Sequence, residues 1–304
     1  MPELSTCKNL IVERSFFESK TQDKFQCLLT VASEHVGKSG GLRAKGLYKK
    51  TLSDKPLITV ITAVYNGEEH LEETILSVLN QNYDNIEYII IDGGSTDNTL
   101  EIINKYQYHI DYWISEPDKG ISDAFNKGII FSTGDYINFQ GDGDGFYDSS
   151  ALLRIVEQIN KTKAKLICGR IQRTTPEGTQ LYISNSLDGF KKSSLLFRMS
   201  LPHQGLFTHI ELFKRYGLFD TNNVFCMDYE FLLRLYHDFP TVAITNAVVA
   251  NWRADGLGNG RTIEIFKEYD FIKRKHKVAS NSLLSLIKYW ALLKLNLKKY
   301  LLKD

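Results

Sequence analysis

The sequence predicts an α/β protein in which a doubly wound sheet is flanked by helices. Residues 57–64 form a nearly continuous apolar and β-branched run, which is typical of a strand buried on both faces of a parallel sheet. Strand-like and helix-like segments then alternate up to residue 140. Polar clusters follow the strand-like segments, and sheets of this kind bind ligands at the carboxyl ends of their strands.

Each element of this alternation has its own pattern. Buried strands are expected at residues 57–64, 86–91, 110–115 and 135–140. Apolar residues at helical spacing predict three intervening helices, marked by Leu71, Ile75, Val78 and Leu79, by Leu100 and Ile103 after a cap at Asp97 or Asn98, and by residues 122–131.

The remainder of the chain is expected to complete the same domain and then to leave it. Residues 165–171 and 241–249 have the character of strands, and residues 227–239 that of a helix. We therefore predict an N-terminal extension (1–55), one domain divided into halves at 56–148 and 149–255, and a basic, amphipathic, helical C-terminal region (256–304).

Charge and cysteine content exclude several classes of protein. The 37 basic and 36 acidic residues give a net charge of +1, which predicts no binding to nucleic acid. Cys7, Cys27, Cys168 and Cys226 have no C-x-x-C spacing, which argues against a zinc site or a disulfide framework. The N-terminus has no secretory signal pattern, and no apolar run reaches the ~18 residues of a membrane span. A cytoplasmic location is expected.

An acidic pair, Asp142 and Asp144, follows the strand-like segment 135–140 and is surrounded by glycines. Two carboxylates this close repel each other unless a cation neutralises them, and oxygen ligands suit Mg²⁺ or Mn²⁺. A solvated Gly/Asp turn is the alternative interpretation of the pair taken alone.

Four ordered motifs extend this pattern: ITAVYNG, IIIDGGSTDNT, SEPDKGISDAFNKGI and the D-x-D pair. Together they resemble the nucleotide half of the inverting family 2 glycosyltransferases, closely over residues 57–150 and more loosely to 255. The resemblance implies a GT-A type, Rossmann-like mixed sheet, with a nucleotide half at 56–148 and an acceptor half at 149–255. Gly93 replaces the second Asp of the commoner family pattern, as in a subgroup resembling colanic-acid and O-antigen transferases.

The resemblance also implies roles for individual residues in the nucleotide half. It assigns Asp92 to the nucleotide base, Asp144 to the metal ion and Asp142 to an assisting position on the same ion. Further residues expected to line the nucleotide site are Thr62, Tyr65, Asn66, Glu116, Asp118, Lys119, Gly120, Asp123, Asn126 and Gly128.

In the acceptor half, the expected general base is Asp228, which resembles the acidic residue before a family helix ending in Arg234. Glu230 is the second candidate for the base, and a helix N-cap is the alternative role for Asp228. The resemblance places His203 and Gln204 near the diphosphate or acceptor. It places Trp252, Arg253 and Arg261 in a Gly-rich segment that either closes over the leaving diphosphate or is a plain surface loop.

The C-terminal region joins a basic stretch at 273–277 to apolar residues near helical spacing between 283 and 295, with lysines among them. A basic amphipathic helix bearing a Trp predicts peripheral contact with the inner face of a membrane, which would suit a lipid-linked acceptor. Packing of the helix on the domain or on a partner is the alternative.

We therefore expect an inverting glycosyltransferase that moves a sugar from a nucleotide-diphosphate sugar to the hydroxyl of a saccharide acceptor. The resemblance favours surface polysaccharide synthesis and UDP as the nucleotide, with GDP or dTDP as alternatives. Two other hypotheses remain, a nucleotidyltransferase and a non-catalytic nucleotide-sugar binding protein. The segment VYNGEEH after the first strand argues against the former, because nucleotidyltransferases usually place a Gly-rich basic loop there.

Overall fold

The computed structural model of the chain describes residues 12–13, 37–254, 256 and 260–301. Most of the expected N-terminal extension lies outside the described residues, as do Cys7 and Cys27. Cys168 and Cys226 are buried and free.

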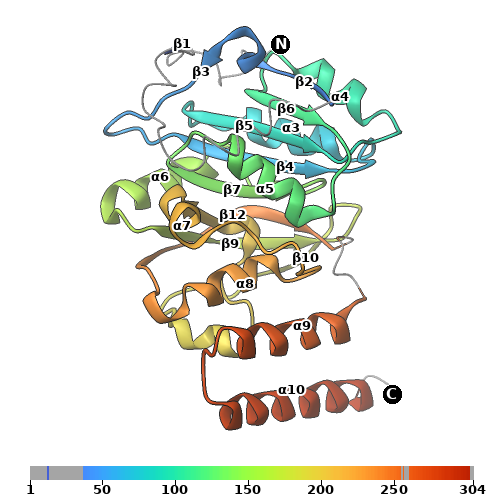
Figure 1. Cartoon of the computed structure of the whole chain (residues 1–304), viewed down its shortest axis with the longest axis vertical. Coiled ribbons are helices and arrows are strands. Elements are labelled where there is room, and N and C mark those ends of the chain that lie inside the picture. The colour runs from blue at the N-terminus through green and yellow to red at the C-terminus, as the bar shows by residue number, and fades with distance from the viewer. Residues whose placement is uncertain (1–11, 14–36, 255, 257–259, 302–304) are drawn as a thin grey trace.

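One mixed sheet organises the described residues. Its strands follow the order β2-β6-β5-β4-β7-β11-β9-β12-β8, with β10 paired to β9, while β1 and β3 pair separately (Figure 1). The strands are β1 (Val12–Glu13), β2 (Lys38–Gly40), β3 (Leu47–Tyr48), β4 (Ile58–Val64), β5 (Ile86–Asp92), β6 (Tyr112–Ser115), β7 (Tyr136–Gly141), β8 (Gly145–Phe146), β9 (Leu166–Thr174), β10 (Gln180–Ile183), β11 (Leu206–His209) and β12 (Val242–Arg253).

Helices cover both faces of this sheet. The α-helices are α3 (Leu71–Leu79), α4 (Thr99–Tyr106), α5 (Ile121–Phe131), α6 (Ala151–Thr162), α7 (Ile210–Tyr216), α8 (Met227–Arg234), α9 (Thr262–Lys275) and α10 (Asn281–Leu301). Short 3-10 turns are η2 (Leu42–Lys45), η3 (Lys192–Leu196), η4 (His203–Gly205) and η5 (Tyr236–Asp238). The predicted α/β fold class is confirmed, and each strand and helix expected in the nucleotide half is present.

The sheet is buried on both faces, because successive side chains of its central strands pack alternately into two cores. Ile61 of β4 packs in the core that contains α5 and α8, whereas Val60 packs in the core that contains α3 and α6. Every residue of β4 and β5 is buried, as a strand covered on both faces requires. Gly128 lets α5 lie close to β4, because a Cβ atom there would be 2.4 Å from Ile61 Cγ2.

Four parallel strands set the position of the site. Strands β6, β5, β4 and β7 run in the same direction, so that their carboxyl ends meet at one edge. Along that edge Val64 is in register with Asp92, and Asp92 with Ser115. On the other side of β4, Ala63 is in register with Gly141, which precedes the acidic pair.

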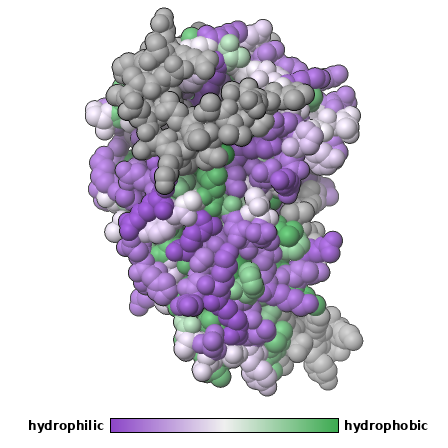
Figure 2. Space-filling view, viewed as in Figure 1, coloured by the Kyte–Doolittle hydropathy of each residue, from purple (hydrophilic) through white to green (hydrophobic). Residues whose placement is uncertain are grey.

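The two C-terminal helices lie beside each other at the lower end of the molecule in Figure 1. Leu284 and Ile287 of α10 join the core that contains α8 and α9, so one face of α10 packs on the domain. The opposite side leaves Leu286 67%, Tyr289 70% and Trp290 47% exposed, and hydrophobic residues show at this end of the surface (Figure 2). Within the described residues, no helix has the length and apolar character needed to cross a membrane.

Candidate active site

The turns after β4 and β5 are joined to each other at the shared edge. Asn66, whose φ of 52° lies in the left-handed region, donates from its backbone N–H to Ser95 Oγ at 2.7 Å. Its side-chain oxygen accepts from the backbone N–H of Thr96 at 2.9 Å. Asp97 precedes Asn98, the N-cap residue of α4, and accepts from the backbone N–H and hydroxyl of Thr99. Asn66 therefore holds the two turns in one rigid edge.

Asp92 also serves this edge rather than facing a ligand. It has no exposed surface. Its carboxylate accepts hydrogen bonds from the Ser115 hydroxyl at 2.5 Å and from the backbone N–H and hydroxyl of Ser95. This differs from the expectation that Asp92 contacts the base, because a carboxylate without exposed surface offers no lone pair to a bound molecule.

Two further residues expected at the nucleotide site are buried. The Thr62 side chain has no exposed surface and shares a 3.1 Å hydrogen bond with the hydroxyl of Tyr88, inside the sheet. Asn126 is 8% exposed, and its amide exchanges two hydrogen bonds with the backbone of Phe219. Both lie beneath the site, and Asn126 joins α5 to the segment that leads into α8.

Tyr65 and Asp118, both expected at the nucleotide site, flank the turn after β5. Tyr65 is 65% exposed. Both side chains flank Gly93, since a Cβ there would be 2.7 Å from Asp118 Oδ2 and 3.3 Å from Tyr65 Cδ2. The absence of a side chain at Gly93 thus makes room for the Asp118 carboxylate, which is also held by the Gly120 N–H at 2.8 Å.

Lys119 and Asp123 lie beside Asp118 at the start of α5. Lys119 is exposed, and its backbone N–H donates to Asp123 Oδ2 at 3.1 Å. Glu116 pairs with Lys127 at 2.8 Å, which ties the end of β6 to the same helix. These contacts therefore hold the segment 116–127 in place beside the strand ends. Among the described residues of this segment, Lys119 is a lysine without an ion pair.

The acidic pair stands on a loop anchored to α3. The Thr74 hydroxyl donates to the Asp144 carbonyl at 2.7 Å and accepts from the Gly143 N–H at 3.0 Å. The Asp142 carboxylate lies against Gly67, where an added Cβ would be 2.6 Å from Asp142 Oδ2. Thr74 lies on a helix that faces the loop and has no motif of its own, so the sequence does not mark it as a site residue.

Three neutral donors orient the Asp144 carboxylate, which is 9% exposed. Oδ2 accepts from the Gln204 amide at 3.0 Å and from the Gly141 N–H at 3.3 Å, and Oδ1 accepts from the backbone N–H of Arg253 at 3.1 Å. Gln204, expected near the diphosphate or acceptor, thus touches the predicted metal ligand.

The donor set at this loop fits a hard divalent cation. Asp142 and Asp144 offer only oxygen, which Mg²⁺ and Mn²⁺ prefer. Among the described residues, no group of three or more His, Cys, Asp and Glu side chains is placed to hold a metal ion. A cation here would therefore take one or two carboxylates and complete its coordination from the donor phosphates, the usual arrangement for Mg²⁺.

Arg253 lies on a strand rather than in a loop. It is the last residue of β12 and is 8% exposed, and its guanidinium is 2.7 Å from His70 Nε2. Gly143 allows this approach, since a Cβ there would be 2.7 Å from Arg253 Cδ. Trp252 stacks on Arg173 at 4.2 Å, whereas Arg261 is exposed and pairs weakly with Glu264 at 3.7 Å. Of the arginines expected in a lid, only Arg253 reaches the acidic loop, and His70 is a neighbour that sequence analysis missed.

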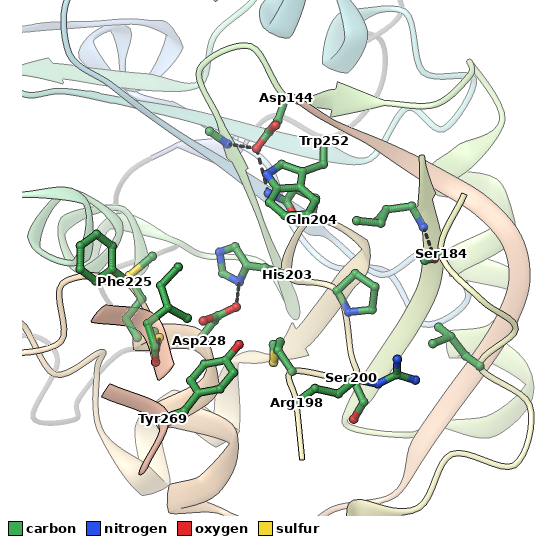
Figure 3. Close-up of a pocket in the computed structure, with 18 of the residues that line it drawn as sticks. Asp144, Ser184, Arg198, Ser200, His203, Gln204, Phe225, Asp228, Trp252 and Tyr269 are labelled. Carbon is green, nitrogen blue, oxygen red and sulfur yellow. Dashed lines mark hydrogen bonds and ion pairs between the residues drawn. The ribbon is translucent and has the colours of Figure 1, made fainter. Parts of the chain in front are cut away.

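A second carboxylate faces the acidic loop from the acceptor half. Asp228, in the first turn of α8, lies with Oδ2 3.9 Å from His203 Nδ1 (Figure 3). The His203 ring stacks on Phe139 with ring centroids 5.2 Å apart. Burial lowers the pKa of His203 from its usual 6.5, and Asp228 offsets only part of this effect, so the imidazole is neutral near pH 7. The residue at the N-cap of α8 is Cys226, not Asp228.

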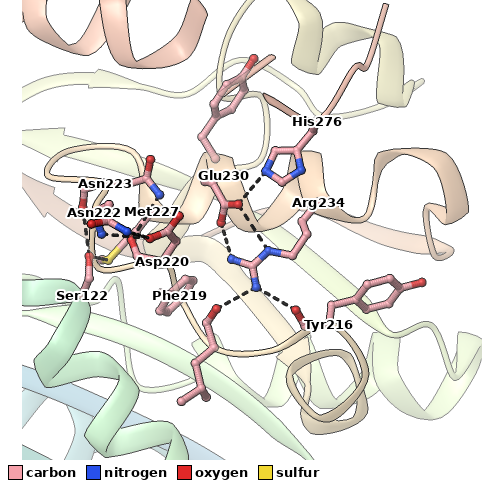
Figure 4. A network of polar contacts seen from close by, with 12 residues as sticks. Ser122, Tyr216, Phe219, Asp220, Asn222, Asn223, Met227, Glu230, Arg234 and His276 are labelled. Atoms are coloured by element: carbon pink, nitrogen blue, oxygen red, sulfur yellow. Dashed lines mark hydrogen bonds and ion pairs between the residues drawn. The ribbon is translucent and has the colours of Figure 1, made fainter. Parts of the chain in front are cut away.

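Glu230, the second candidate for the base, is turned away from that face of α8. It is 1% exposed and pairs with Arg234 and with His276 Nε2 at 2.6 Å, while Arg234 also donates to the carbonyls of Tyr216 and Leu218 (Figure 4). Burial raises the pKa of Glu230, but hydrogen bonds from His276 and Arg234 outweigh it and hold the pKa below the usual 4.5. Glu230 therefore anchors α8 to α9 beneath Asp228.

One cavity connects these parts. Its volume is about 570 Å³, and Asp144, Gln204 and Trp252 line one end while His203 and Asp228 line its middle (Figure 3). The far end is formed by residues around Arg198 and Ser200 and by Tyr269 of α9. Asp144 and Asp228 thus face the same space from opposite halves of the domain.

A mixed sheet whose parallel strands end at a D-x-D loop, with a second carboxylate across one cavity, defines the GT-A class of glycosyltransferases. The chain belongs to glycosyl transferase family 2, whose profile matches residues 59–231. The predicted family and enzyme class are confirmed.

Similar proteins agree with this membership. An uncharacterized glycosyltransferase of Mycobacterium tuberculosis is 28% identical over 222 residues, covering 69% of this chain and 80% of the relative. A PGL/p-HBAD biosynthesis glycosyltransferase of Mycobacterium bovis is 26% identical over 224 residues, covering 72% and 84%.

Solved structures share the fold. S. aureus TarS 1-349 in complex with UDP-GlcNAc aligns with a TM-score of 0.61 and 14% identity, over 76% of this chain and 70% of that one. The mannosyltransferase PcManGT from Pyrobaculum calidifontis, in complex with GDP-Man and Mn²⁺, aligns with a TM-score of 0.58 and 17% identity, over 75% and 66%.

Proposed function

We propose that this glycosyltransferase moves a sugar, with inversion, from a UDP-sugar to an acceptor hydroxyl. The observation that carries the proposal is the cavity of about 570 Å³ shared by Asp144 and Asp228. An oxygen ligand for a cation at one end and a carboxylate in the middle suit a donor diphosphate and an attacking hydroxyl, respectively.

The donor binds along the strand-end edge in this proposal. Tyr65 stacks on the base and Asp118 accepts a hydrogen bond from it, because these side chains stand at the solvent side of Gly93. Arg253 and Lys119 offset diphosphate charge, and the contact with His70 holds the Arg253 guanidinium in place.

A divalent cation, Mg²⁺ or Mn²⁺, is held by Asp144 with help from Asp142. When bound, it neutralises negative charge on the departing nucleoside diphosphate. The structure of PcManGT with GDP-Man and Mn²⁺ is an example of such a cation in a protein of the same fold.

Asp228 is the general base. As the acceptor oxygen forms its bond to the anomeric carbon, the hydroxyl proton passes to Asp228 and the bond between the sugar and the diphosphate breaks. His203, which lies 3.9 Å from Asp228 and whose pKa is lowered by burial, places no positive charge beside the carboxylate.

We also propose a lipid-linked saccharide as the acceptor, in the synthesis of a surface glycoconjugate of the colanic-acid or O-antigen kind. A relative in Mycobacterium bovis is described as a PGL/p-HBAD biosynthesis glycosyltransferase. The exposed apolar side of α10, with Leu286, Tyr289 and Trp290, supports peripheral contact with the inner face of an anionic membrane.

The test of the catalytic proposal is nucleoside diphosphate release from a panel of UDP-, GDP- and dTDP-sugars, with alkyl glycosides as acceptors. Asp228→Asn should lower kcat about 10²–10⁴-fold, and Asp144→Ala should abolish metal-dependent turnover, with a smaller loss for Asp142→Ala. Asp54→Asn, at an exposed residue before the amino end of β4, is the control. Full activity of Asp228→Asn, or a product with retained anomeric configuration, would contradict the proposal.

Membrane contact is tested separately by co-sedimentation with vesicles of anionic or neutral phospholipid. Replacing Leu286 and Trp290 with serine should reduce binding to anionic vesicles. The matched control is Tyr108→Ser, because Tyr108 is 58% exposed but lies in the nucleotide half. Equal sedimentation of all three proteins would exclude α10 as the contact.

A further inference from the structure

The far end of the cavity carries a positive charge that the proposed chemistry does not use. Arg198 lines the cavity beyond Asp228, next to Ser200 (Figure 3). Among the described residues that line this cavity, it is the one arginine or lysine. Its side chain is exposed, and within the described part of the chain no ion pair or side-chain hydrogen bond engages its guanidinium.

This cation is separate from the donor phosphates. Asp144 of the acidic loop, whose Oδ1 accepts from the backbone N–H of Arg253, lies at the opposite end of the cavity, with His203 and Asp228 between (Figure 3). A molecule that presents a hydroxyl to Asp228 and continues away from the donor would therefore pass Arg198. A guanidinium binds phosphate oxygens through paired hydrogen bonds, so an anionic group on that molecule fits this end.

An apolar path leads from Arg198 to the C-terminal helix. The neighbouring residue, Phe197, is 54% exposed and packs edge-on against Trp290 of α10, with ring centroids 6.1 Å apart. Lys294 Nζ lies 3.7 Å above the Trp290 ring. Leu286 and Leu293 continue the exposed apolar side of α10. Arg198, at the far end of the cavity, is thus next to the exposed apolar surface of Phe197 and α10. Lys294 lies beside that surface.

We infer that Arg198 binds the phosphate through which the acceptor saccharide is joined to its lipid, and that the lipid leaves over Phe197 and Trp290. The saccharide then occupies the cavity between Arg198 and Asp228, and the phosphate fixes which hydroxyl reaches the base. The inference rests on the proposed glycosyl transfer and deepens it, because it makes an anionic lipid link part of acceptor recognition.

The experiment measures binding of farnesyl diphosphate, farnesol and inorganic diphosphate by tryptophan fluorescence. Saturating UDP and Mn²⁺ are present throughout, so that the donor end of the cavity is filled. The proteins are the full wild-type chain, Arg198→Ala, Arg198→Lys and the control Arg215→Ala. Arg215 is an exposed arginine paired with Asp238 and is not among the residues that line the cavity. Thermal unfolding of each variant checks that it is folded.

Farnesyl diphosphate should bind the wild type and Arg215→Ala alike. Arg198→Ala should raise its Kd about 10- to 100-fold, the loss expected for hydrogen bonds to a charged group, and Arg198→Lys should recover part of that loss. Farnesol and inorganic diphosphate should each bind more weakly than farnesyl diphosphate, because each lacks one half of the recognised group.

Equal farnesyl diphosphate binding by Arg198→Ala and wild type would overturn the inference. Equal binding of farnesol would overturn it as well, because the lipid alone would then suffice, and equal binding of inorganic diphosphate would show an anion site without a lipid path. The proposed function is judged independently: donor turnover that depends on Asp144 and Asp228 can stand while Arg198→Ala has no effect.

Discussion

The strand-end edge that leads to Asp144 and the acceptor side of the cavity are built in opposite ways. At the nucleotide end, polar side chains bond mainly to one another: Asn66 joins two turns, Asp92 is closed off by Ser95 and Ser115, and Gln204 orients Asp144. On the acceptor side, Asp228 Oδ1 accepts from the backbone N–H of Tyr229 at 2.7 Å and Oδ2 lies 3.9 Å from His203 Nδ1. Within the described part of the chain, no side-chain hydrogen bond or ion pair engages the Arg198 guanidinium.

This difference has a physical meaning. Groups that are already hydrogen-bonded are preorganised, so a ligand at the nucleotide end meets a surface that needs little rearrangement. Asp228, with fewer side-chain contacts, lies on a helix that is held instead by the Glu230 network with Arg234 and His276. The nucleotide end thus receives a donor on a rigid edge, whereas the acceptor end keeps its charges available for the molecule that it selects.

The largest expected effect concerns the support beneath Asp228. Glu230→Gln leaves Arg234 and His276 without their buried carboxylate and should destabilise the fold by about 3 kcal/mol or more at pH 7. Because the pKa of Glu230 is lowered in the folded state, its contribution is present above pH 4.5 and is lost as the pH falls through the lowered value. The difference in unfolding free energy between Glu230→Gln and the wild type should therefore become smaller below pH 4.5.

Urea unfolding at pH 7 and pH 4 measures this difference. Glu211→Gln is the matched control, since Glu211 is 58% exposed and pairs with Lys165 on the surface; its effect should stay within about 1 kcal/mol. If Glu230→Gln is as stable as Glu211→Gln at pH 7, then α8 needs no support from the Glu230 network, and the proposed difference between the two sides of the site is wrong.

A second prediction concerns the hydrogen bonds that orient Asp144. Gln204→Ala removes the amide that orients Asp144 Oδ2 at 3.0 Å, and such outer partners of a metal ligand usually contribute about 10- to 100-fold in metal affinity. The Mn²⁺ concentration for half-maximal turnover should rise by that factor. Gln158→Ala on α6 is the control, and an unchanged Mn²⁺ requirement for Gln204→Ala would show that Asp144 needs no orientation.

The smallest expected effects distinguish the role of Asp118 from that of Asp92. Asp118→Asn should weaken UDP binding about tenfold, as expected when a hydrogen bond loses its charge, whereas Asp92→Asn should act mainly on the stability of the turn, by about 1–3 kcal/mol. Calorimetric titration with UDP and urea unfolding measure the two quantities. If Asp92→Asn weakens UDP binding more than Asp118→Asn does, Asp92 contacts the base after all.

Sequence patterns predicted where the strands end but not the direction in which each side chain points. The run at 57–64 and its three successors predicted the parallel strands and the meeting of their ends, since period and burial are local properties. The family resemblance placed Thr62, Asp92 and Asn126 at the nucleotide site, and the structure has all three buried. A strand alternates its faces, and only the packed neighbours decide which face a ligand can reach.

By itself, the sequence determined the fold class and the family, because the alternation of strands and helices and the order of the motifs are both properties of the chain taken in sequence. The roles of Asp144 and Asp228 stay predictions. Only the tertiary structure decided what those residues touch. It brought Gln204 to Asp144, His70 to Arg253 and Glu230 to His276, contacts between segments far apart in sequence. It also placed Arg198 between the cavity and α10, because the position of a side chain between two surfaces depends on how the helices pack and has no signature in the local sequence.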